Sequence, residues 1–362
     1  MKLTPWILVA GAALALSCGG KKNDEGGGGA TKTTEGGGTR SADHGGGSVT
    51  LNGSGSSFQK AFQEVAIEAY TKAHGNVKIN YGGGGSGKGR QDLADMVVDF
   101  AGSDAPYKDA DKAKIKGGDV LYFPILLGAV SVSYHLDGVD KLQLSPETVA
   151  KIFQRDIKKW NDAAIAADNP GVKLPDTDIT VAHRSDGSGT TDIFTHFLDG
   201  GSNGVWKLKA GGTVEWPADT QAGAQNNGVA QIVTATNGAI GYVDLSDAKA
   251  AKLTYAAIKN SAGKYITPDA ASVSAAGEGI DVKDDLTFSA VNAKGDAAYP
   301  ITGQTWVIVY AKPSDKAKAA ALKDYLAFLL GDGQKLAPEV DFAPLPKSLQ
   351  DKAIAQLSKI QT

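Results

Sequence analysis

The fold is decided by the stretch ITVAHRSDGSGTT, residues 179–191. Its first part, Ile179–His183, begins with three β-branched residues, which is typical of a strand. Behind the stretch, Ile193, Phe194, Phe197 and Leu198 recur at helical spacing. A strand, a glycine-rich turn and a helix in this order indicate an α/β protein with mostly parallel sheets.

The turn inside this stretch combines a cation, a carboxylate, glycines and hydroxyl groups, from Arg184 to Thr191. A helix N-terminus presents unpaired N–H groups and a positive dipole end. Glycine lets this backbone approach a ligand, and the Arg184 guanidinium suits an oxyanion. The turn therefore predicts a socket for a small tetrahedral anion. The structural alternative is a capped helix that follows a glycine turn.

The same order of strand, Gly/Ser cluster and helix recurs in the first part of the chain. Predicted strands at Ser48–Asn52, Val77–Tyr81 and Val98–Ala101 each end in such a cluster. Because ligands of α/β sheets bind at the carboxyl ends of strands, we expect the four clusters to meet at one site. The remaining predictions are strands at Tyr122–Tyr134, Ala239–Val243 and Thr305–Tyr310, and helices at Phe58–Tyr70, Gln91–Met96, Ser145–Phe153, Trp160–Ala167, Gly228–Thr234 and Lys316–Leu330.

The clusters supply hydroxyl donors and one carboxylate of special interest. The hydroxyl groups are those of Ser57, Ser86, Ser188 and Thr190. A carboxylate such as Asp104 repels an anion unless the anion carries a proton to donate, which phosphate does at neutral pH and sulfate does not. Asp104 is therefore predicted to select protonated oxyanions; the alternative is a plain Ser-Asp turn before Pro106.

Asp186 follows Arg184 by two residues, and we expect it to accept a hydrogen bond from the guanidinium and to orient it. The alternative role for Asp186 is a helix N-cap, and both roles are compatible.

The start of the chain has the pattern of an export signal. Lys2 precedes the uncharged, mostly apolar run Trp6–Leu16, which is too short to span a bilayer. Cys18, the chain's only cysteine, follows at once, and residues 19–47 contain no large apolar residue. We interpret 1–17 as a lipoprotein signal peptide, Cys18 as the lipidated residue and 18–47 as a disordered tether. Ala15 stands where such signals usually carry leucine, and the alternative for Cys18 is an incidental thiol.

Composition argues against several classes of function. The net charge of −3 and a pI of about 6.0 give no basic field for nucleic acid. The five histidines do not pair at metal spacing, so neither a metal site nor a cofactor is expected. Residues 82–88 fit most of a P-loop, but Gly89 stands where a nucleotide site needs Ser or Thr. We interpret Lys88 as a solvated loop lysine or a modest electrostatic aid.

Hydrolase chemistry is not indicated either. Neither Ser86 nor Ser188 sits in a G-x-S-x-G nucleophile elbow, and no histidine stands out as a general base for a serine. The sequence therefore favours a binding protein over an enzyme.

Taken in order, the motifs give the chain a family resemblance. After the linker it resembles the phosphate-specific substrate-binding proteins of bacterial ABC importers. The matching stretches are Gly53–Phe58, Asn80–Tyr81, Gly85–Ser86, Asp99–Phe100, Ser103–Pro106, Lys158–Trp160, Arg184–Thr190, Gly238–Tyr242 and Tyr299–Thr302.

The resemblance implies a periplasmic-binding-protein type II fold with two α/β lobes joined by two hinge crossings, near Leu126–Leu127 and Ala298–Tyr299. Lobe one would hold residues 48–126 and 299–362, and lobe two residues 127–298. By position, the implied phosphate contacts are Ser57, Phe58 through its N–H, Ser86, Asp104 as proton acceptor, Arg184 with Asp186 orienting it, Ser188, Gly189 and Thr190.

The implied function is binding of inorganic phosphate outside the cytoplasm and its delivery to an ABC permease by a lipid-anchored monomer. Ser57 replaces the family's usual threonine, Gln59 replaces a usual proline, and the second loop is richer in glycine. The alternatives are a receptor for another oxyanion, an extracytoplasmic phosphatase, and a phosphate sensor or surface adhesin.

Overall fold

The computed structural model describes residues 48–361. The signal peptide predicted at 1–17, Cys18 and the tether predicted at 18–47 lie outside the described residues. None of the helices in 48–361 combines the length and the apolar character that a membrane span requires.

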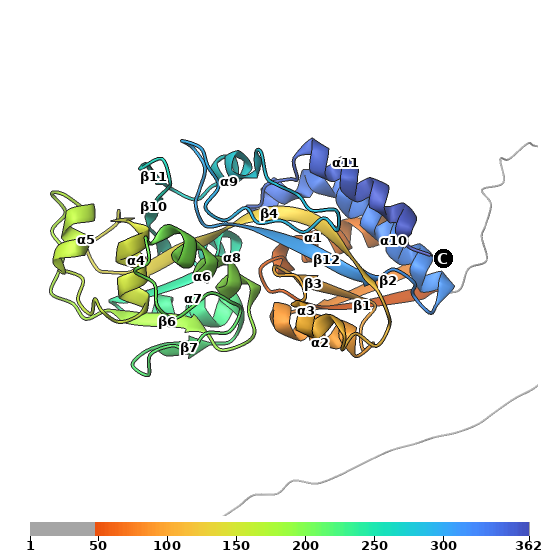
Figure 1. Ribbon diagram of the computed structural model, residues 1–362, viewed down its shortest axis with the longest axis horizontal. Coiled ribbons are helices and arrows are strands. Elements are labelled where there is room, and N and C mark those ends of the chain that lie inside the picture. The colour runs from red at the N-terminus through yellow and green to blue at the C-terminus, as the bar shows by residue number, and fades with distance from the viewer. Residues whose placement is uncertain (1–47, 362) are drawn as a thin grey trace, which may run out of the picture. The chain divides into compact units, whose positions relative to one another are not determined.

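One part of the main sheet is built from strands β1, β2, β3 and β12. Their bounds are Val49–Gly55, Val77–Gly82, Phe100–Ser103 and Thr302–Tyr310. β1 pairs in parallel with β2 and β3, while β12 runs antiparallel to β3. The helices around these strands are α1 (Lys60–Ala73), α2 (Ser86–Ala94), α3 (Asp109–Lys112), α10 (Lys316–Leu330), a 3₁₀ segment (Asp332–Val340), α11 (Lys347–Gln356) and a final 3₁₀ turn (Leu357–Lys359). Figure 1 places α2 on one side of β1 and β3, and α1 and α10 on the other.

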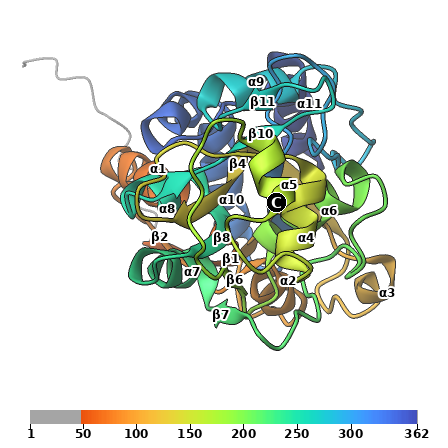
Figure 2. The same ribbon diagram turned by 90° about the vertical axis from the view of Figure 1, so that its left-hand side faces the viewer.

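A second part of the sheet is built from β6 (Thr180–Arg184), β7 (Gln221–Gly223) and β8 (Ala239–Asp244), which pair in parallel. Its helices are α4 (Pro146–Phe153), α5 (Ala163–Asp168), α6 (Gly189–Gly201), α7 (Gln225–Ala235), α8 (Leu245–Ala250) and α9 (Ala270–Gly277). α4 and α5 face the viewer in Figure 2. A small separate sheet contains β5 (Gln143–Leu144), β10 (Ala257–Lys259) and β11 (Tyr265–Ile266), and β9 (Thr254–Tyr255) pairs with β4.

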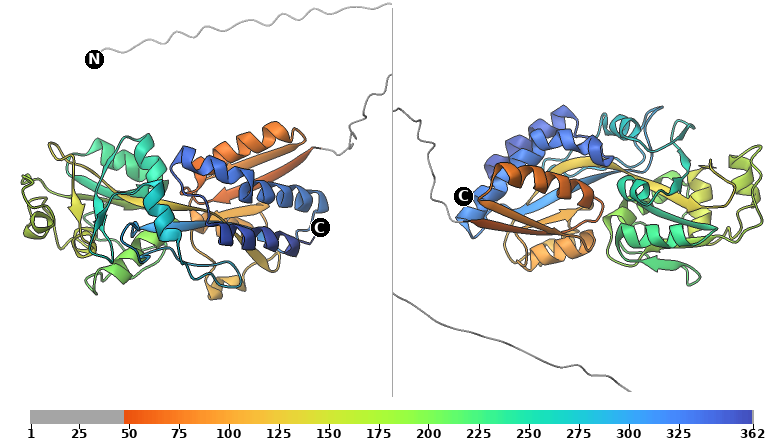
Figure 3. Two further views of the ribbon diagram at one scale, coloured as in Figure 1. Left: turned by 90° about the horizontal axis from the view of Figure 1, so that it is seen from above. Right: turned by 180° about the vertical axis from the view of Figure 1, so that it is seen from behind.

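The long strand β4, Val120–His135, connects the two parts. It pairs with β12 as far as Ala129 and with β8 from Val130 onward. Figure 1 shows β4 and β12 running side by side between the two groups of elements, and Figure 3 shows the same division from above and from behind. β4 is almost wholly buried, which explains why its sequence reads as one continuous apolar run.

The predicted α/β architecture with mostly parallel sheets is confirmed, and the four Gly/Ser clusters do follow the ends of β1, β2, β3 and β6. Three helices begin three or more residues away from their predicted starts. α2 begins at Ser86 instead of Gln91, α5 at Ala163 instead of Trp160, and α7 at Gln225 instead of Gly228.

Glycine is a poor helix former, which is why residues 87–89 resemble a loop in the sequence. In the structure, a Cβ at Gly89 would lie 2.5 Å from Cα of Gly55. Close packing of α2 on β1 thus requires the glycine, and this packing outweighs the low helix propensity. Trp160 is instead a fully buried side chain ahead of α5, and its indole N–H donates to the carbonyl of Gly238.

Candidate functional site

The site lies where the ends of β1, β3 and β6 and the start of α2 meet. Ser57 and Phe58 follow β1, Ser86 opens α2, Asp104 follows β3, and Arg184 ends β6. A Cβ built on Gly189, the first residue of α6, would lie 2.4 Å from both Asp104 Oδ2 and Ser86 Oγ. The N-terminus of α6 therefore faces Asp104 directly, and the structure brings residues from both parts of the sheet into one place.

Asp104 is buried and accepts hydrogen bonds from three hydroxyl groups. Ser56 Oγ lies 2.7 Å from both carboxylate oxygens, Ser86 Oγ donates to Oδ2 at 3.0 Å, and Thr305 Oγ1 donates to Oδ1 at 2.6 Å. Each hydroxyl oxygen in turn accepts an N–H, from Phe58, from Asp104 itself and from Gln59 respectively. Because an ionised carboxylate can only accept, the hydrogen of each of these hydroxyl groups is the one that is donated to Asp104.

An ionised carboxylate offers about four acceptor positions. Three hydroxyl donors leave about one position on Asp104 for a further hydrogen. Burial raises the pKa of Asp104, while the hydrogen bonds from Thr305, Ser56 and Ser86 and the positive charge of Arg184 oppose that rise. The site is thus arranged so that an incoming group with a proton can donate it to this carboxylate.

Arg184 is held from two sides. Its Nε and Nη2 atoms both pair with the carboxylate of Asp186, and its Nη1 donates to Asn226 Oδ1 at 2.8 Å. Burial works against the charge of Asp186, but the hydrogen bond and the charge of Arg184 hold its pKa below the usual value. The predicted hydrogen bond from Arg184 to Asp186 is present, and the role of Asp186 in orienting Arg184 toward a ligand stays a prediction. The backbone N–H of Gln225 also donates to Asp186, at 2.9 Å.

α6 begins at the site because Ser188 caps it. The Ser188 hydroxyl oxygen accepts the N–H of Thr191 at 3.0 Å. The N–H groups of Gly189 and Thr190 belong to the first turn and have no partner within the helix. The Tyr242 hydroxyl anchors this start by accepting the Arg184 N–H at 3.2 Å and by pairing with the Thr191 hydroxyl at 2.7 Å.

Ser57 supplies an independent indication of a ligand. Its residue is 6% exposed, and its Oγ has no hydrogen-bond partner within residues 48–361. An unpaired buried hydroxyl costs roughly 1–3 kcal/mol. A ligand oxygen in the site would remove that cost. The Phe58 N–H, by contrast, is used within the loop, where it donates to Ser56 Oγ at 3.0 Å.

Lys88 does not reach the site. Its ammonium pairs with Asp92 one turn along α2, at 2.5 Å, and its side chain is more than half exposed. This placement fits a solvated lysine and not a phosphate-cradling loop.

Sequence reasoning missed Ser56, Thr305 and Asn226. Ser56 lies in the cluster Gly53–Phe58, so its position in that loop could have identified it. Thr305 and Asn226 lie far along the chain from the groups they contact, Asp104 and Arg184. No local pattern marks them.

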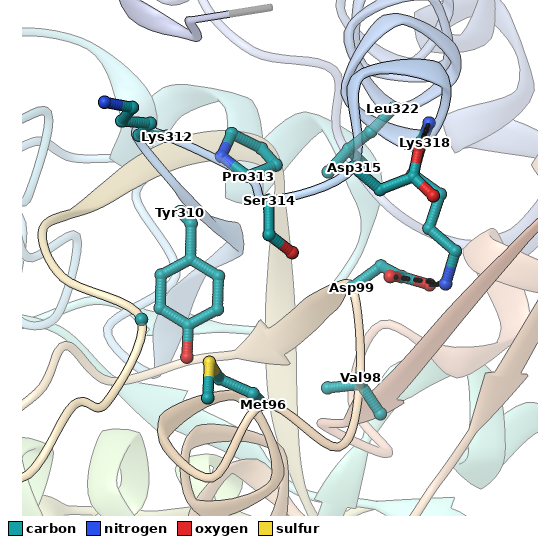
Figure 4. A pocket seen from close by; sticks show the side chains of 11 residues that line it. Met96, Val98, Asp99, Tyr310, Lys312, Pro313, Ser314, Asp315, Lys318 and Leu322 are labelled. Atoms are coloured by element: carbon teal, nitrogen blue, oxygen red, sulfur yellow. Dashed lines mark hydrogen bonds and ion pairs between the residues drawn. The ribbon is translucent and has the colours of Figure 1, made fainter.

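A separate cavity of about 350 Å³ lies at the opposite end of β3 (Figure 4). Its lining includes Met96, Tyr310 and Lys318. Lys318 is paired with the Asp99 carboxylate at 3.0 Å, so the charge of Lys318 is already neutralised. None of the predicted site residues lines this cavity. Within 48–361 there is also no group of three or more His, Cys, Asp or Glu side chains placed to hold a metal ion.

Comparison with known proteins gives consistent matches. The pattern of the PBP superfamily domain matches residues 33–333. Phosphate-binding protein PstS of Xylella fastidiosa (strain 9a5c) is 39% identical over 308 residues, covering 83% of this chain and 83% of that protein. Phosphate-binding protein PstS 2 of Mycobacterium tuberculosis is 34% identical over 367 residues, covering 98% of this chain and 97% of that protein.

Solved structures agree in fold. A high affinity periplasmic phosphate-binding protein, PfluDING, bound with phosphate, has a TM-score of 0.72 at 22% identity, covering 85% of this chain and 94% of that one. A putative phosphate ABC transporter substrate-binding protein from Clostridium perfringens was solved with bound phosphate. Its TM-score is 0.61 at 16% identity, and the match covers 82% of this chain and 100% of that one. These likenesses confirm the predicted two-lobed periplasmic-binding-protein fold.

Proposed function

We propose that this chain, which belongs to the PBP superfamily and within it to the PstS phosphate-binding proteins, binds inorganic phosphate outside the cytoplasm and delivers it to an ABC import permease. The proposal rests on one observation: a hydrogen-bond acceptor and a group of hydrogen-bond donors face each other in one site. Asp104 has about one acceptor position to spare, and it faces the N-terminus of α6, beside which Arg184 lies.

Phosphate satisfies both sides of such a site. Its proton would be donated to Asp104, while its negative oxygens would accept from Arg184, the hydroxyl groups of Ser57, Ser188 and Thr190, and the N–H groups of Gly189 and Thr190. Ser86 and Phe58 would line the site, since the Ser86 hydroxyl and the Phe58 N–H already donate to Asp104 and to Ser56 Oγ. Charge-assisted hydrogen bonds are worth about 1.5–3 kcal/mol each. A few of them reach the roughly 8 kcal/mol of micromolar binding without a basic surface. Sulfate has no proton for Asp104 and is rejected.

We place lobe one at residues 48–126 and 299–362 and lobe two at 127–298, joined by β4 and by the chain entering β12. The contact groups come from both lobes, so the anion itself favours the closed arrangement.

The proposal treats the chain as a binding protein and not as an enzyme. Ser86 donates to Asp104, and no histidine within 48–361 hydrogen-bonds to Ser86, so the hydroxyl lacks an activating base of the usual kind. Turnover of a chromogenic phosphate ester by the purified protein would contradict this part.

The anchoring and the partners are part of the same proposal. A monomer tethered through lipidated Cys18 would stay near the permease while it collects phosphate. The change Cys18→Ser should move the chain from the membrane fraction to the soluble fraction. Cells that lack the chain should lose phosphate uptake, and the wild-type chain should restore it.

Isothermal titration of the full chain with phosphate and with sulfate tests the binding proposal. We expect tight binding of phosphate and weak or absent binding of sulfate. The change Asp104→Asn should reduce that difference, because an amide can donate to sulfate. Equal affinity of the wild-type chain for the two anions would refute the proposed role of Asp104.

A further inference from the structure

A line of buried polar side chains runs away from the site behind Asp104. It consists of Thr305, Gln59, Gln63 and Tyr325, each with no exposed surface. Buried polar groups are costly unless they are paired, so a complete line of this kind is a specific feature of the core. Gln59 stands where the resembled family usually has proline, which has no side-chain amide. The line therefore depends on a residue by which this chain departs from that pattern.

The hydrogen bonds along the line all point the same way. Tyr325 Oη donates to Gln63 Oε1 at 2.7 Å, and Gln63 Nε2 donates to Gln59 Oε1 at 2.8 Å. Gln59 Nε2 then donates to Thr305 Oγ1 at 2.7 Å. Thr305 Oγ1 ends the line by donating to Asp104 Oδ1 at 2.6 Å.

A backbone carbonyl fixes this direction. Gln59 Nε2 also donates to the carbonyl oxygen of Trp306 at 3.0 Å. A carbonyl can only accept, so the amide nitrogen of Gln59 must face it, and the amide oxygen must face Gln63. Gln63 then has to present its nitrogen to Gln59 and its oxygen to Tyr325. Thr305 Oγ1 receives the Gln59 hydrogen and has its own hydrogen to donate. Asp104 Oδ1 at 2.6 Å is a much nearer acceptor for it than the Ser103 carbonyl oxygen at 3.5 Å.

We propose that the line Tyr325–Gln63–Gln59–Thr305 is a specificity determinant, which fixes Asp104 as a hydrogen-bond acceptor and so restricts the site to oxyanions that carry a proton. The proposal rests on the proposed phosphate function and assigns it positioning residues outside the ligand contacts. A protonated Asp104 could donate to sulfate. The hydrogen bond from Thr305 stabilises the ionised form of Asp104, so Asp104 takes up a proton less readily.

The charges around Asp104 set the expected pH dependence. Burial raises the pKa of Asp104, whereas its hydroxyl donors, Thr305 foremost, and the charge of Arg184, which faces it from β6, act in the opposite direction. Tyr81, on β2, is the other titratable neighbour; burial and then the charge of Asp104 raise the pKa of that phenol well above its usual range, so it stays neutral. Removing the Thr305 donor therefore raises the pKa of Asp104. As the pH is lowered, a variant without this donor should therefore lose its discrimination against sulfate at a higher pH than the wild type does.

The test uses the full chain and isothermal titration with phosphate and with sulfate, from about pH 4 to about pH 8. Thr305→Val keeps the shape and removes the donor, and it should lower the phosphate-to-sulfate affinity ratio about tenfold. Thr305→Ser keeps a hydroxyl and should restore both the ratio and the pH at which discrimination fails. Thr302→Val is the matched control: Thr302 is also buried on β12, but its hydroxyl donates to the Tyr299 carbonyl and does not contact Asp104.

The remote members of the line give a second measurement in case Thr305→Val fails to fold. Gln59→Met and Tyr325→Phe each remove polar atoms and keep the bulk, and their effects on the ratio should decrease with distance from Asp104. The proposal is overturned if these variants or Thr305→Val bind phosphate with the wild-type ratio and pH profile, or if Thr302→Val changes the ratio as much as Thr305→Val. If the wild-type chain itself binds no phosphate, both the proposed function and the proposal about this line are refuted.

Discussion

The backbone N–H of Gly87 donates a hydrogen bond of 2.8 Å to the carbonyl oxygen of Gly187. Gly87 lies in the first turn of α2, and Gly187 lies in the turn before α6. The bond therefore joins the loop that carries Ser86 to the loop that carries Arg184. The extra glycines of the second loop have a physical reason here, because two backbones can approach this closely only where no side chain separates them.

Gly87→Ala should weaken phosphate binding. A Cβ at this position would lie 3.1 Å from Cα and from the carbonyl oxygen of Gly187. Overpacking of this kind costs about 1–3 kcal/mol, which corresponds to a loss of roughly fivefold to 150-fold in affinity. Thermal stability without ligand should change little, because alanine also favours the helix. Titration with phosphate checks the prediction, with Gly75→Ala as the control, since nothing lies within 4 Å of a Cβ there. Unchanged affinity in Gly87→Ala would show that this contact does not matter for closure.

Trp216 should report ligand binding by its fluorescence. Its ring stacks on His183, with centroids 4.9 Å apart, and His183 directly precedes Arg184. Burial lowers the pKa of His183, so the stacked ring is neutral at pH 7. Phosphate bound at Arg184 should change the surroundings of this pair and hence the emission.

The fluorescence change should be lost in Trp216→Phe and kept in Trp160→Phe, because Trp160 is fully buried against Tyr134, outside the site. A change that survives Trp216→Phe would assign the signal to another tryptophan.

The loops of the site and their meeting at the carboxyl ends of strands were predictable from the sequence, whereas the supporting residues on other elements were not. Arg184, Asp186 and Ser188 lie in one turn, so their chemistry and spacing identify them together. Thr305 meets Asp104 only because β12 pairs with β3 in the register that sets Trp306 opposite Ser103. Register between distant strands is decided by core packing, which a single sequence does not display.

Asn226 should prove essential for positioning Arg184. Its amide oxygen accepts from Arg184 Nη1 at 2.8 Å, and its amide nitrogen donates to Asp244 Oδ2 at 2.7 Å. Asp244 is fully buried, and burial followed by the charge of Asp247 raises its pKa well above the usual value. Asn226→Leu would leave Arg184 Nη1 and Asp244 without this partner, at a cost of about 1–3 kcal/mol in stability.

Phosphate affinity should fall at least tenfold in Asn226→Leu, because the guanidinium is then held only by Asp186 and by the long contact of 3.4 Å between Nη1 and Thr190 Oγ1. Thermal unfolding and titration measure the two effects. The neighbouring residue Asn227 is exposed, so Asn227→Ala should change neither. Wild-type affinity in a destabilised Asn226→Leu would mean that Asn226 serves the fold and not the site.

Asp104→Asn should stabilise the ligand-free protein at neutral pH, although it reduces the discrimination between phosphate and sulfate. The pKa of Asp104 is raised by burial in the folded state. Such a carboxyl favours folding below its unfolded pKa of about 3.9, and this contribution is lost as the pH rises through the higher folded value. At pH 7 the buried charge therefore opposes folding. Its removal should add about 1 kcal/mol, a common gain where function requires a strained site.

The gain from Asp104→Asn should shrink as the pH falls through the folded pKa, because wild-type Asp104 then takes up its own proton. Asp186→Asn provides the opposite case. The pKa of Asp186 is held below its usual value by Arg184, so its ionised form stabilises the fold above about pH 3.9, and that contribution fades in acid. Thermal unfolding without phosphate across this range should give a gain for Asp104→Asn and a loss for Asp186→Asn at pH 7. Losses for both variants would mean that Asp104 is a net stabilising carboxylate, and that its hydroxyl donors outweigh the cost of its burial.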